Sequence, residues 1–510
     1  MTNSLLLRDY QSLTLNEIYD KFITKHQLVS TLGMGGGKTI IISEVAKYYY
    51  NNNKNIVILT NISELIPQIE EQLLLQNLPY NIIKSGEEYI ENNNNCQITL
   101  IMEQSFHENF RKKNNTIKCD ILIKDEYHIG KGNKRYEDIK MFLAPDNVLG
   151  LTGTPLDSMG FLMEGVELED LILHGSVAEL TRKGFLTPLK YLVPEWSTLV
   201  DYSSIKCTDD YSTSELEYKI NTTQHNDLII QSMNKIKAKT KKTLVYCNSI
   251  DHSNEIYNKL KKEGYKVGCV NSTKTKEYND SVIHRYSLPI SDINSIDCIV
   301  SVSKLTTGFN QPQAELLVLA RPTKILRLYL QMIFRVARLY PNKKFGIILD
   351  LSQCVAEHGF GTQEINYIKS NRLTKSEKRK IKIDKKVESK LRLEAIKEIT
   401  TNSTNNIEIT NKKINVKLKE LRVKNVQLKT TITKNLINIF KNTTDIELVT
   451  SIGFELNYRI NKKTYEYKTV LEKIENYKID YEDTKEINKN KYLIELKNKY
   501  QTQIKEKRVG

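Results

Sequence analysis

Short apolar runs alternate with amphipathic stretches through residues 1–195. Apolar runs of about four to eight residues have the length of buried strands, whereas the stretches between them have the period of helices. A strand–helix series of this kind predicts a parallel sheet that is covered by helices on both faces. The predicted strands are 56–60 (IVILT), 97–102 (QITLIM), 119–126 (CDILIKDE) and 148–155 (VLGLTGTP).

A second series of the same kind follows a polar stretch. Residues 197–222 are rich in Ser, Thr and Asp and have no clear apolar periodicity, which predicts a linker. We therefore predict two α/β domains in tandem, at residues 1–196 and 223–370. The strands predicted for the second domain are 243–247 (TLVYC), 265–270 (YKVGCV), 297–302 (DCIVSV), 315–320 (ELLVLA) and 345–351 (FGIILDL).

Beyond residue 370 the chain is rich in Lys and Asn, and we expect a basic, mostly α-helical extension at residues 371–510. Residues 411–430 fit both a strand and a helix pattern, so their fold stays open. The extension holds 34 of the 76 Lys and Arg residues and 19 of the 61 Asp and Glu residues, and thus the whole net charge of +15. Such a segment predicts a polyanionic partner, although an AT-rich genome also enriches Lys and Asn.

The sequence has no run of about 18 apolar residues, so no membrane span is expected. The N-terminus also lacks the basic and apolar segments of a signal peptide. We therefore expect the protein to stay in the cytoplasm where it is made, which would be the host cytoplasm for a phage protein, and not to be secreted.

A glycine-rich segment at residues 33–39 (GMGGGKT) precedes an apolar helix start. Glycines let backbone N–H groups curl round phosphate oxygens, because a Cβ would block the approach. The positive end of the following helix also favours an anion. Lys38 would reach the β- and γ-phosphates of ATP, and the Thr39 hydroxyl would hold Mg²⁺. The predicted phosphate-binding residues are Gly35, Gly36, Gly37, Lys38 and Thr39.

Residues 125–128 (DEYH) end the apolar strand that begins at Cys119. A carboxylate at the carboxyl end of a strand projects into the crevice where α/β proteins bind ligands. Asp125 would hold Mg²⁺, and Glu126 would orient and deprotonate an attacking water. An Asp-Glu pair alone is more often a solvated strand end, but the phosphate loop in the same predicted domain favours the catalytic interpretation.

Together with residues 152–155 (TGTP), these segments resemble motifs I, II and III of the superfamily 2 helicases of the DExH type. Four other segments resemble further motifs of that superfamily. Residues 7–11 (LRDYQ) resemble the adenine-reading Q motif, which implies that Arg8 and Gln11 bind the nucleotide and that Gln11 pairs with its base. Residues 60–68 resemble motif Ia, which touches the nucleic-acid backbone. The last two segments are 306–312 (TTGFNQP), similar to motif V, and 331–338 (QMIFRVAR), similar to motif VI.

The resemblance implies two RecA-like domains with ATP and Mg²⁺ between them. Lys38, Asp125 and Glu126 would act on ATP from the first domain, and Gln331, Arg335 and Arg338 from the second. Arginines that face the departing γ-phosphate can be worth about 10³–10⁵ in rate, and they make domain closure depend on ATP. The residues expected to couple the ATP site to nucleic acid are His128, Thr152, Thr154, Thr307 and Gly308.

Two residues depart from the family pattern. Phe334 stands where motif VI usually has glycine, and it could crowd the neighbouring arginine. Asn310 stands where motif V usually has aspartate, and it removes a charge that helps to couple nucleic acid to the ATP site. Neither change deletes a catalytic group, so an active ATPase is still expected.

The resemblance implies an ATP-dependent helicase or translocase, and we favour DNA over RNA as its partner. The combination of TGTP, DExH and residues 179–186 (ELTRKGFL) is similar to restriction-type and phage-type DNA helicases, and the DEAD tetrapeptide is absent. Two alternatives stay open: an RNA helicase of the same architecture, and a nucleic-acid-binding translocase or annealing factor that does not unwind. The oligomeric state and the pathway, whether replication, repair or recombination, also stay open.

Overall fold

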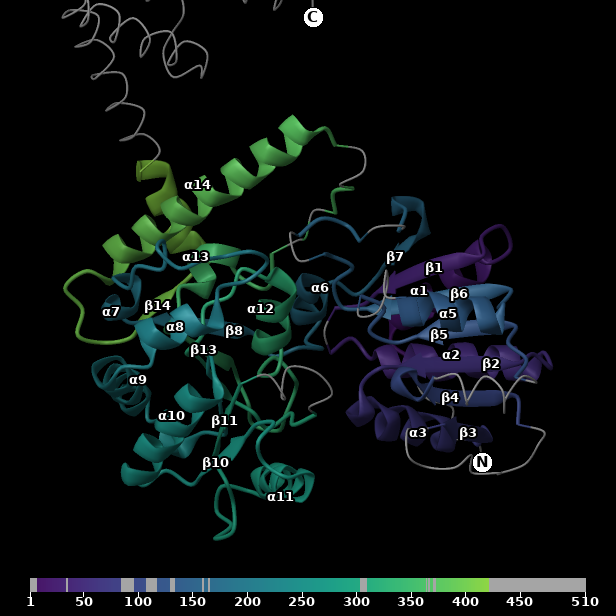
Figure 1. Ribbon diagram of the computed structural model, residues 1–510, viewed down its shortest axis with the longest axis horizontal. Helices are drawn as coiled ribbons and strands as arrows, with labels where there is room; N and C mark the ends of the chain where they lie inside the picture. The colour runs from purple at the N-terminus through teal and green to yellow at the C-terminus, as the bar shows by residue number, and fades with distance from the viewer. Residues whose placement is uncertain are drawn as a thin grey trace, which may run out of the picture. The chain divides into compact units, whose positions relative to one another are not determined.

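Two seven-stranded sheets, one after the other along the chain, organise the protein (Figure 1). They belong to a computed structural model of 510 residues, in which residues 1–411 and 412–510 form two units. Both sheets lie in the first unit. The residues that the structure describes are 7–33, 35–83, 96–106, 117–128, 134–157, 160–163, 166–302, 310–363, 365, 367–369 and 373–421.

The first domain is built on a parallel sheet with the strand order β3-β4-β2-β5-β6-β1-β7. Strands β2 and β5 are buried along their whole length, as expected for a parallel sheet with helices on its faces. The strands are β1 (Gln27–Thr31), β2 (Ile56–Thr60), β3 (Tyr80–Ile83), β4 (Ile98–Met102), β5 (Ile121–Lys124), β6 (Asn147–Thr152) and β7 (Leu171–Leu173). The helices are α1 (Asp9–Lys21), α2 (Lys38–Asn51), α3 (Ile66–Leu75), α5 (Lys134–Leu143) and α6 (Val177–Arg182).

The second domain repeats this architecture with the strand order β10-β11-β9-β12-β13-β8-β14, in which only the β14–β8 pair is antiparallel. The strands are β8 (Leu189–Val193), β9 (Thr243–Tyr246), β10 (Val267–Val270), β11 (Cys298–Ser301), β12 (Leu316–Leu319), β13 (Gly346–Asp350) and β14 (Ile407–Ile409). The helices are α7 (Glu195–Thr198), α8 (Thr213–Ile220), α9 (Thr223–Lys235), α10 (Ile250–Lys262), α11 (Lys276–Ser287), α12 (Leu326–Ile333), α13 (Cys354–His358) and α14 (Lys375–Thr400).

Apolar helix faces pack on these sheets and form a core in each domain. In the second domain, Ile256 and Leu260 of α10 join Val245 of β9 and Val300 of β11 in one buried cluster. Helix α10 begins where the Ser249 hydroxyl accepts a hydrogen bond from a backbone N–H of the first turn. The nine predicted strands all occur, and the prediction of two parallel-sheet α/β domains is confirmed.

The structure differs from the sequence expectation at the edges of the domains. Strand β8 lies before the expected boundary at residue 196 but pairs with β13 of the second sheet. The expected linker contains α8, whose Leu216 and Ile220 are buried with Tyr202. Strand β14 of the expected extension also completes the second sheet. These elements are short, and their partners lie far away in sequence, so local periodicity does not reveal them.

Within the described ranges, no helix is both long enough and apolar enough to cross a bilayer.

Gly150 of β6 is a point of close contact in the first domain, because the ring of Tyr127 lies directly over it. A Cβ at this position would lie 2.4 Å from Cγ of Tyr127. We expect Gly150→Ala to lower the free energy of unfolding by about 1–3 kcal/mol, as over-packing does. Urea denaturation measures this loss. In a Tyr127→Ala background the same substitution should cost less, and an equal cost in both backgrounds would contradict the steric explanation.

Candidate active site

The carboxyl ends of β1, β5 and β6 lie side by side at one edge of the first sheet. Thr31 at the end of β1 is in register with Thr152 at the end of β6, and Lys124 of β5 is in register with Gly150. Each strand leads directly into one of the predicted motifs. The parallel topology therefore brings residues 33, 35–39, 125–128 and 152–154 together at the edge where α/β proteins bind ligands.

The loop from β1 to α2 has the geometry of an anion site. Gly37, the residue before α2, has a left-handed backbone with φ +82°, and a Cβ there would lie 2.6 Å from Nε2 of Gln11. This turn directs the unpaired N–H groups at the start of a 14-residue helix toward one point. Gly35 also has a positive φ of +84°. Met34 lies outside the described residues.

Two buried side chains of helix α1 donate hydrogen bonds to this loop. The Tyr10 hydroxyl donates to the Gly36 carbonyl at 2.8 Å, and Nε2 of Gln11 donates to the same oxygen at 3.3 Å. Oε1 of Gln11 accepts a hydrogen bond from the backbone N–H of Arg8 at 3.0 Å. Gln11 thus holds the phosphate loop, and its pairing with a base stays a prediction.

Lys38 forms the centre of a buried charge cluster. Its Nζ lies 3.9 Å from Oδ1 of Asp125 and makes a closer ion pair with Oε1 of Glu126. Burial would lower the pKa of Lys38, but the two carboxylates outweigh burial and raise it. Burial raises the pKa of Asp125 above its usual range. For Glu126, burial is opposed by Lys38 and His128, which bring its pKa below the usual value.

The backbone of Glu126 is bent to reach Lys38. Its φ is +46°, in the left-handed region that non-glycine residues rarely adopt. Its N–H donates to Oδ1 of Asp125 at 2.8 Å, which fixes the turn after β5. Residues held in sparsely populated conformations cluster at functional sites. The turn therefore places two adjacent carboxylates at the same cation.

His128 connects this cluster to the end of β6. Its Nδ1 lies 2.8 Å from the Thr152 hydroxyl and 3.3 Å from Oε2 of Glu126. Oγ1 of Thr152 also accepts the backbone N–H of Thr154 at 3.2 Å. Burial lowers the pKa of His128 to about 3, so the imidazole is neutral at physiological pH. A continuous contact path thus runs from Glu126 to residue 154.

The second domain contributes the predicted motif VI residues to the same cavity. Gln331, Arg335 and Arg338 come from α12 and the turn after it. Burial lowers the pKa of Arg335, and it lowers the pKa of Arg338 to about 9. The cavity measures about 380 Å³. Its other lining residues are Arg8, Gly35, Gly37, Lys38, Thr39, Leu65, Gln68, Asp125, Glu126, Phe185, Leu186, Asn310, Phe334 and Leu339.

Two of the predicted coupling residues, Thr307 and Gly308, lie outside the described residues. Asn310, which follows them, accepts a hydrogen bond from Nη1 of Arg338. An aspartate at this position would offer that arginine a charged partner, whereas the amide offers a neutral one. The departure from the family pattern therefore removes an ion pair next to the arginines and keeps a hydrogen bond.

Sequence reasoning missed part of this cavity. The guanidinium carbon of Arg8 lies 4.4 Å from the centroid of the Phe185 ring, a cation–π contact at the wall of the cavity. Phe185 belongs to a segment that we noted only for its family likeness. Leu65 and Gln68, which we expected at the nucleic acid, line the cavity as well. Only the fold reveals these neighbours, because they come from separate loops.

Two family comparisons match the two domains in order. The family described as "Type III restriction enzyme, res subunit" matches residues 4–157, and the family described as "Helicase conserved C-terminal domain" matches residues 224–340. The chain belongs to the superfamily 2 helicases. The prediction of this superfamily from the motifs is thereby confirmed.

Individual relatives of this superfamily 2 chain are distant. A 51.5 kDa protein of a Lactococcus phage is 25% identical over 62% of this chain and 63% of its own length. A Saccharomyces cerevisiae protein, provisionally named the ATP-dependent helicase IRC3, is 23% identical over 47% of this chain and 34% of its own. The chain thus spans roughly one third to two thirds of the length of these relatives.

A solved structure shares the fold. It is an ATP-dependent Type ISP restriction-modification enzyme, LlaBIII, bound to DNA. The likeness has a TM-score of 0.51 and 13% identity, and it covers 94% of this chain and 37% of that one. At this identity the likeness supports the helicase fold and nothing finer.

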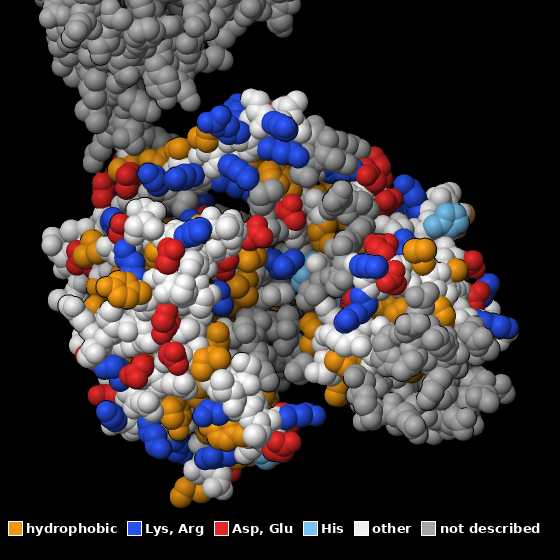
Figure 2. All heavy atoms as spheres, viewed as in Figure 1, with side chains coloured by type: hydrophobic (Ala, Val, Ile, Leu, Met, Phe, Trp, Pro, Cys, Tyr) orange, Lys and Arg blue, Asp and Glu red, His pale blue; other side chains and the backbone are white. Residues whose placement is uncertain are grey.

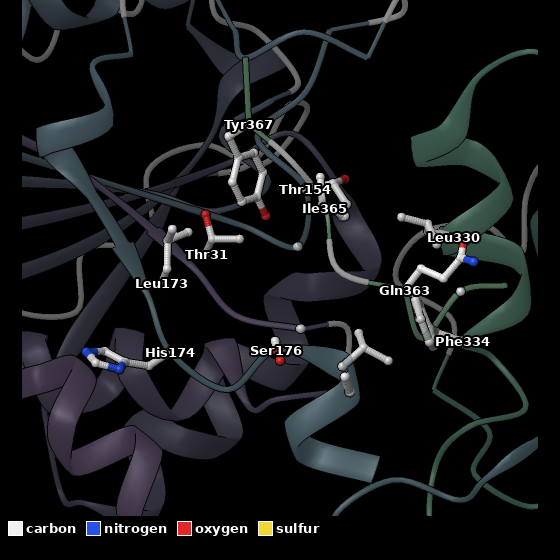
Figure 3. Close-up of a pocket in the computed structure, with 15 residues that line it drawn as sticks. Thr31, Thr154, Leu173, His174, Ser176, Leu330, Phe334, Gln363, Ile365 and Tyr367 are labelled. Carbon is white, nitrogen blue, oxygen red and sulfur yellow. The ribbon is translucent and has the colours of Figure 1, made fainter. Parts of the chain in front are cut away.

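Phe334 of this superfamily 2 chain separates two cavities. It lines the cavity described above and also a second cavity of about 340 Å³. Figure 3 shows the second cavity, with Thr31 and Thr154 on the side of the first domain and Leu330 and Phe334 on the side of the second. Phe334 is only 5% exposed. The bulky ring therefore fills the space between the cavities, beside Arg335.

The buried neutral state of His128 makes a prediction about acid stability. The unfolded chain binds a proton near pH 6.5, whereas the folded site resists it down to about pH 3. Above pH 6.5 neither state binds this proton, and His128 gives the free energy of unfolding no pH dependence. As the pH falls from 6.5 toward about 3, only the unfolded chain binds the proton, and the free energy of unfolding falls by about 1.4 kcal/mol per pH unit. His128→Gln should therefore make the free energy of unfolding fall less steeply with acid in urea titrations.

His284→Gln, at an exposed position of α11, is the matched control and should keep the wild-type slope. If the His128 variant had the same slope as the wild type, the folded protein would be accepting the proton, and the neutral His128 would be wrong.

Proposed function

We propose that the chain is an ATP-driven helicase or translocase of the DExH type that acts on nucleic acid, with DNA as the favoured substrate. The observation that carries the proposal is the composition of one cavity. Its walls hold the phosphate loop and the Lys38–Glu126 pair on one side and Gln331, Arg335 and Arg338 on the other. A site assembled from two domains can turn the binding and loss of a phosphate into domain motion.

The lining of the cavity fits a triphosphate. Backbone N–H groups of the loop, Lys38 and two arginines supply positive charge at one place, which suits an anion with several charges. Lys38 would exchange Glu126 for phosphate oxygens, and this would leave Glu126 available to orient and deprotonate the attacking water. Arg335 and Arg338 would stabilise the charge that develops on the departing phosphate, with Gln331 beside them.

Mg²⁺ also fits, provided that the phosphates complete its coordination. Thr39 and Asp125 are the protein groups that we assign to it. Among the described residues, no cluster of three or more His, Cys, Asp or Glu side chains is able to hold a metal alone. Magnesium commonly uses one or two protein ligands together with substrate phosphates and water, so a site of this kind is sufficient. The ion would neutralise charge between the β- and γ-phosphates.

The path from Glu126 through His128 to Thr152 and Thr154 is the proposed route between hydrolysis and nucleic acid. All four side chains are buried or nearly so, and a change at Glu126 would alter the hydrogen bond of the adjacent imidazole. We also expect Thr307 and Gly308 to contribute from the second domain. Rigid, packed contacts of this kind transmit a local change better than solvated ones.

The preference for DNA draws its support from the relatives. The description of one matching family names a restriction enzyme. A restriction-modification enzyme that shares the fold is bound to DNA in its solved structure. The phage relative further supports a phage origin, which would place the protein in the cytoplasm of a bacterial host. An RNA helicase of the same architecture is the second candidate, and the two make different predictions.

Removal of the proposed base should abolish turnover without abolishing nucleotide binding. We expect Glu126→Gln to lower ATP hydrolysis by about 10²-fold or more, in the range for a lost general base, while a fluorescent ATP analogue still binds. Lys38→Ala should lose both binding and turnover, because the charge toward the phosphates is gone. Steady-state phosphate release and equilibrium binding measure the two effects.

Lys118→Ala, at an exposed lysine of the same domain, is the control and should behave as the wild type. Full turnover in either Glu126→Gln or Lys38→Ala would exclude this cavity as the hydrolytic site.

The substrate preference is tested by ATP hydrolysis with no nucleic acid, single-stranded DNA, duplex DNA, forked DNA and RNA at two salt concentrations. We expect a DNA form to give the strongest stimulation, and a weaker effect at high salt, because phosphate contacts release counterions. Stimulation by RNA alone would transfer the protein to the RNA class. Strand displacement, measured in parallel, separates a helicase from a translocase that does not unwind.

A further inference from the structure

Helix α14 is the longest helix of the described chain, and its C-terminal half is the more closely packed one. Its C-terminal half buries Ala395, Ile396 and Thr400. Nη2 of Arg392 donates to the backbone carbonyl of Glu357 at 3.2 Å, and the Ser389 hydroxyl donates to the side chain of the same residue at 2.9 Å. The N-terminal half is mostly exposed. The helix is thus anchored on α13 at one end and presents its other end to solvent.

Charge is unevenly distributed around this helix. Ten basic and five acidic residues lie within its 26 positions. At about 100° per residue, six of the cations fall within a sector about 80° wide, and all five carboxylates fall outside it. One of the six, Lys397 near the C-terminal end, is partly buried, and the other five are exposed. We call these five residues the α14 stripe. They are Lys375, Arg379, Lys382, Lys386 and Lys390.

The stripe is exposed, and its charges are uncompensated in the described part of the chain. All five residues are exposed, and within the described ranges none of their side chains makes an ion pair or a hydrogen bond. Figure 2 shows Lys and Arg side chains gathered along this helix. From Lys375 to Lys390 the stripe runs about 22 Å along the helix axis, at 1.5 Å per residue. Like charges in a row of this length repel one another, and a bound anion would relieve the repulsion.

The other basic residues of α14 show which side of the helix faces the protein. Nζ of Lys385 lies over the Phe161 ring of the first domain, 5.4 Å from its centroid. Arg392 points toward Glu357 on a nearby side of the helix. On the helical wheel these two residues lie about 100–120° from the middle of the stripe. The contacts therefore hold α14 in an orientation that turns the stripe outward.

We propose that the α14 stripe binds the phosphate backbone of duplex DNA that the motor acts on. This inference rests on the proposed function. A rigid row of cations without base-reading side chains suits sequence-independent contact with phosphates. Proteins that hold single strands add aromatic side chains on which bases stack, and α14 contains no Phe, Tyr or Trp. At about 3.4 Å per phosphate along a strand, the stripe matches the length of roughly six base pairs.

The test compares two variants of the full chain with equal net charge. The stripe variant changes all five residues to Gln: Lys375→Gln, Arg379→Gln, Lys382→Gln, Lys386→Gln and Lys390→Gln. The control variant neutralises five exposed lysines elsewhere on the second domain: Lys237→Gln, Lys239→Gln, Lys261→Gln, Lys262→Gln and Lys276→Gln. Fluorescence anisotropy with a labelled 25-base-pair duplex, and with a single strand of equal length, gives Kd between about 50 and 200 mM salt.

We expect the stripe variant to bind the duplex at least about tenfold more weakly than the control variant. The slope of log K against log salt should also become shallower by about 0.9 for each stripe cation that contacts a phosphate. Basal ATP turnover without nucleic acid should be unchanged, because the stripe lies outside the cavity. Circular dichroism of both variants checks that α14 still folds, and Lys382→Glu with Lys386→Glu should weaken duplex binding further than the two Gln changes at these sites.

Equal duplex affinities of the stripe and control variants would overturn the proposal. An equal loss for the single strand and the duplex would overturn the duplex assignment. The outcomes also separate this proposal from the proposed function. If DNA stimulates turnover but the stripe variant binds the duplex like the control variant, only the proposal for the stripe is wrong. If duplex binding depends on the stripe but no nucleic acid stimulates turnover, the proposed motor function is wrong and the stripe still binds DNA.

Discussion

Lys38 carries its charge in a place that is largely closed to water, and the arrangement of the first domain satisfies that charge. A buried cation is costly unless a carboxylate and further hydrogen bonds compensate it. Glu126 and Asp125 supply this compensation from the end of β5, across the sheet from the loop after β1. The cluster can form only because β6 alone separates the two strands in a parallel sheet. The left-handed backbone of Glu126 then completes the approach.

The same cluster would respond to an anion that enters the proposed nucleotide site. A phosphate that takes over Lys38 leaves Glu126 without its cation, while Arg335 from the second domain still faces it. Each partner that leaves the cluster must be replaced, since an unpaired buried charge is unfavourable. In the proposed ATPase, phosphate, metal and arginine would therefore influence one another through shared electrostatics. Because the charges come from two domains, a change in their balance would alter the electrostatic attraction between the domains.

The extension of the chain after residue 370 has two roles in the described structure. Strand β14 closes the second sheet against β8, and the C-terminal half of α14 packs on α13 and α7. These elements belong to the core of the second domain in spite of their basic composition. Composition identified the excess of charge correctly but did not separate the packed face of α14 from its exposed one. The distinction lies in which positions face Glu357 and Phe161, and a single sequence does not contain it.

The sequence by itself determined the two parallel sheets and the position of their central strands, because long apolar runs such as 56–60 and 315–320 can be buried only between helices. It also identified the charged and glycine residues of the cavity, since phosphate chemistry restricts their types and spacing. The tertiary structure decided what surrounds them: Tyr10 and Gln11 under the loop, Phe185 against Arg8, and Phe334 between two cavities. It also decided that β8 and β14 join the second sheet. These features depend on contacts between residues distant in sequence, and such contacts leave no local period for a sequence pattern to report.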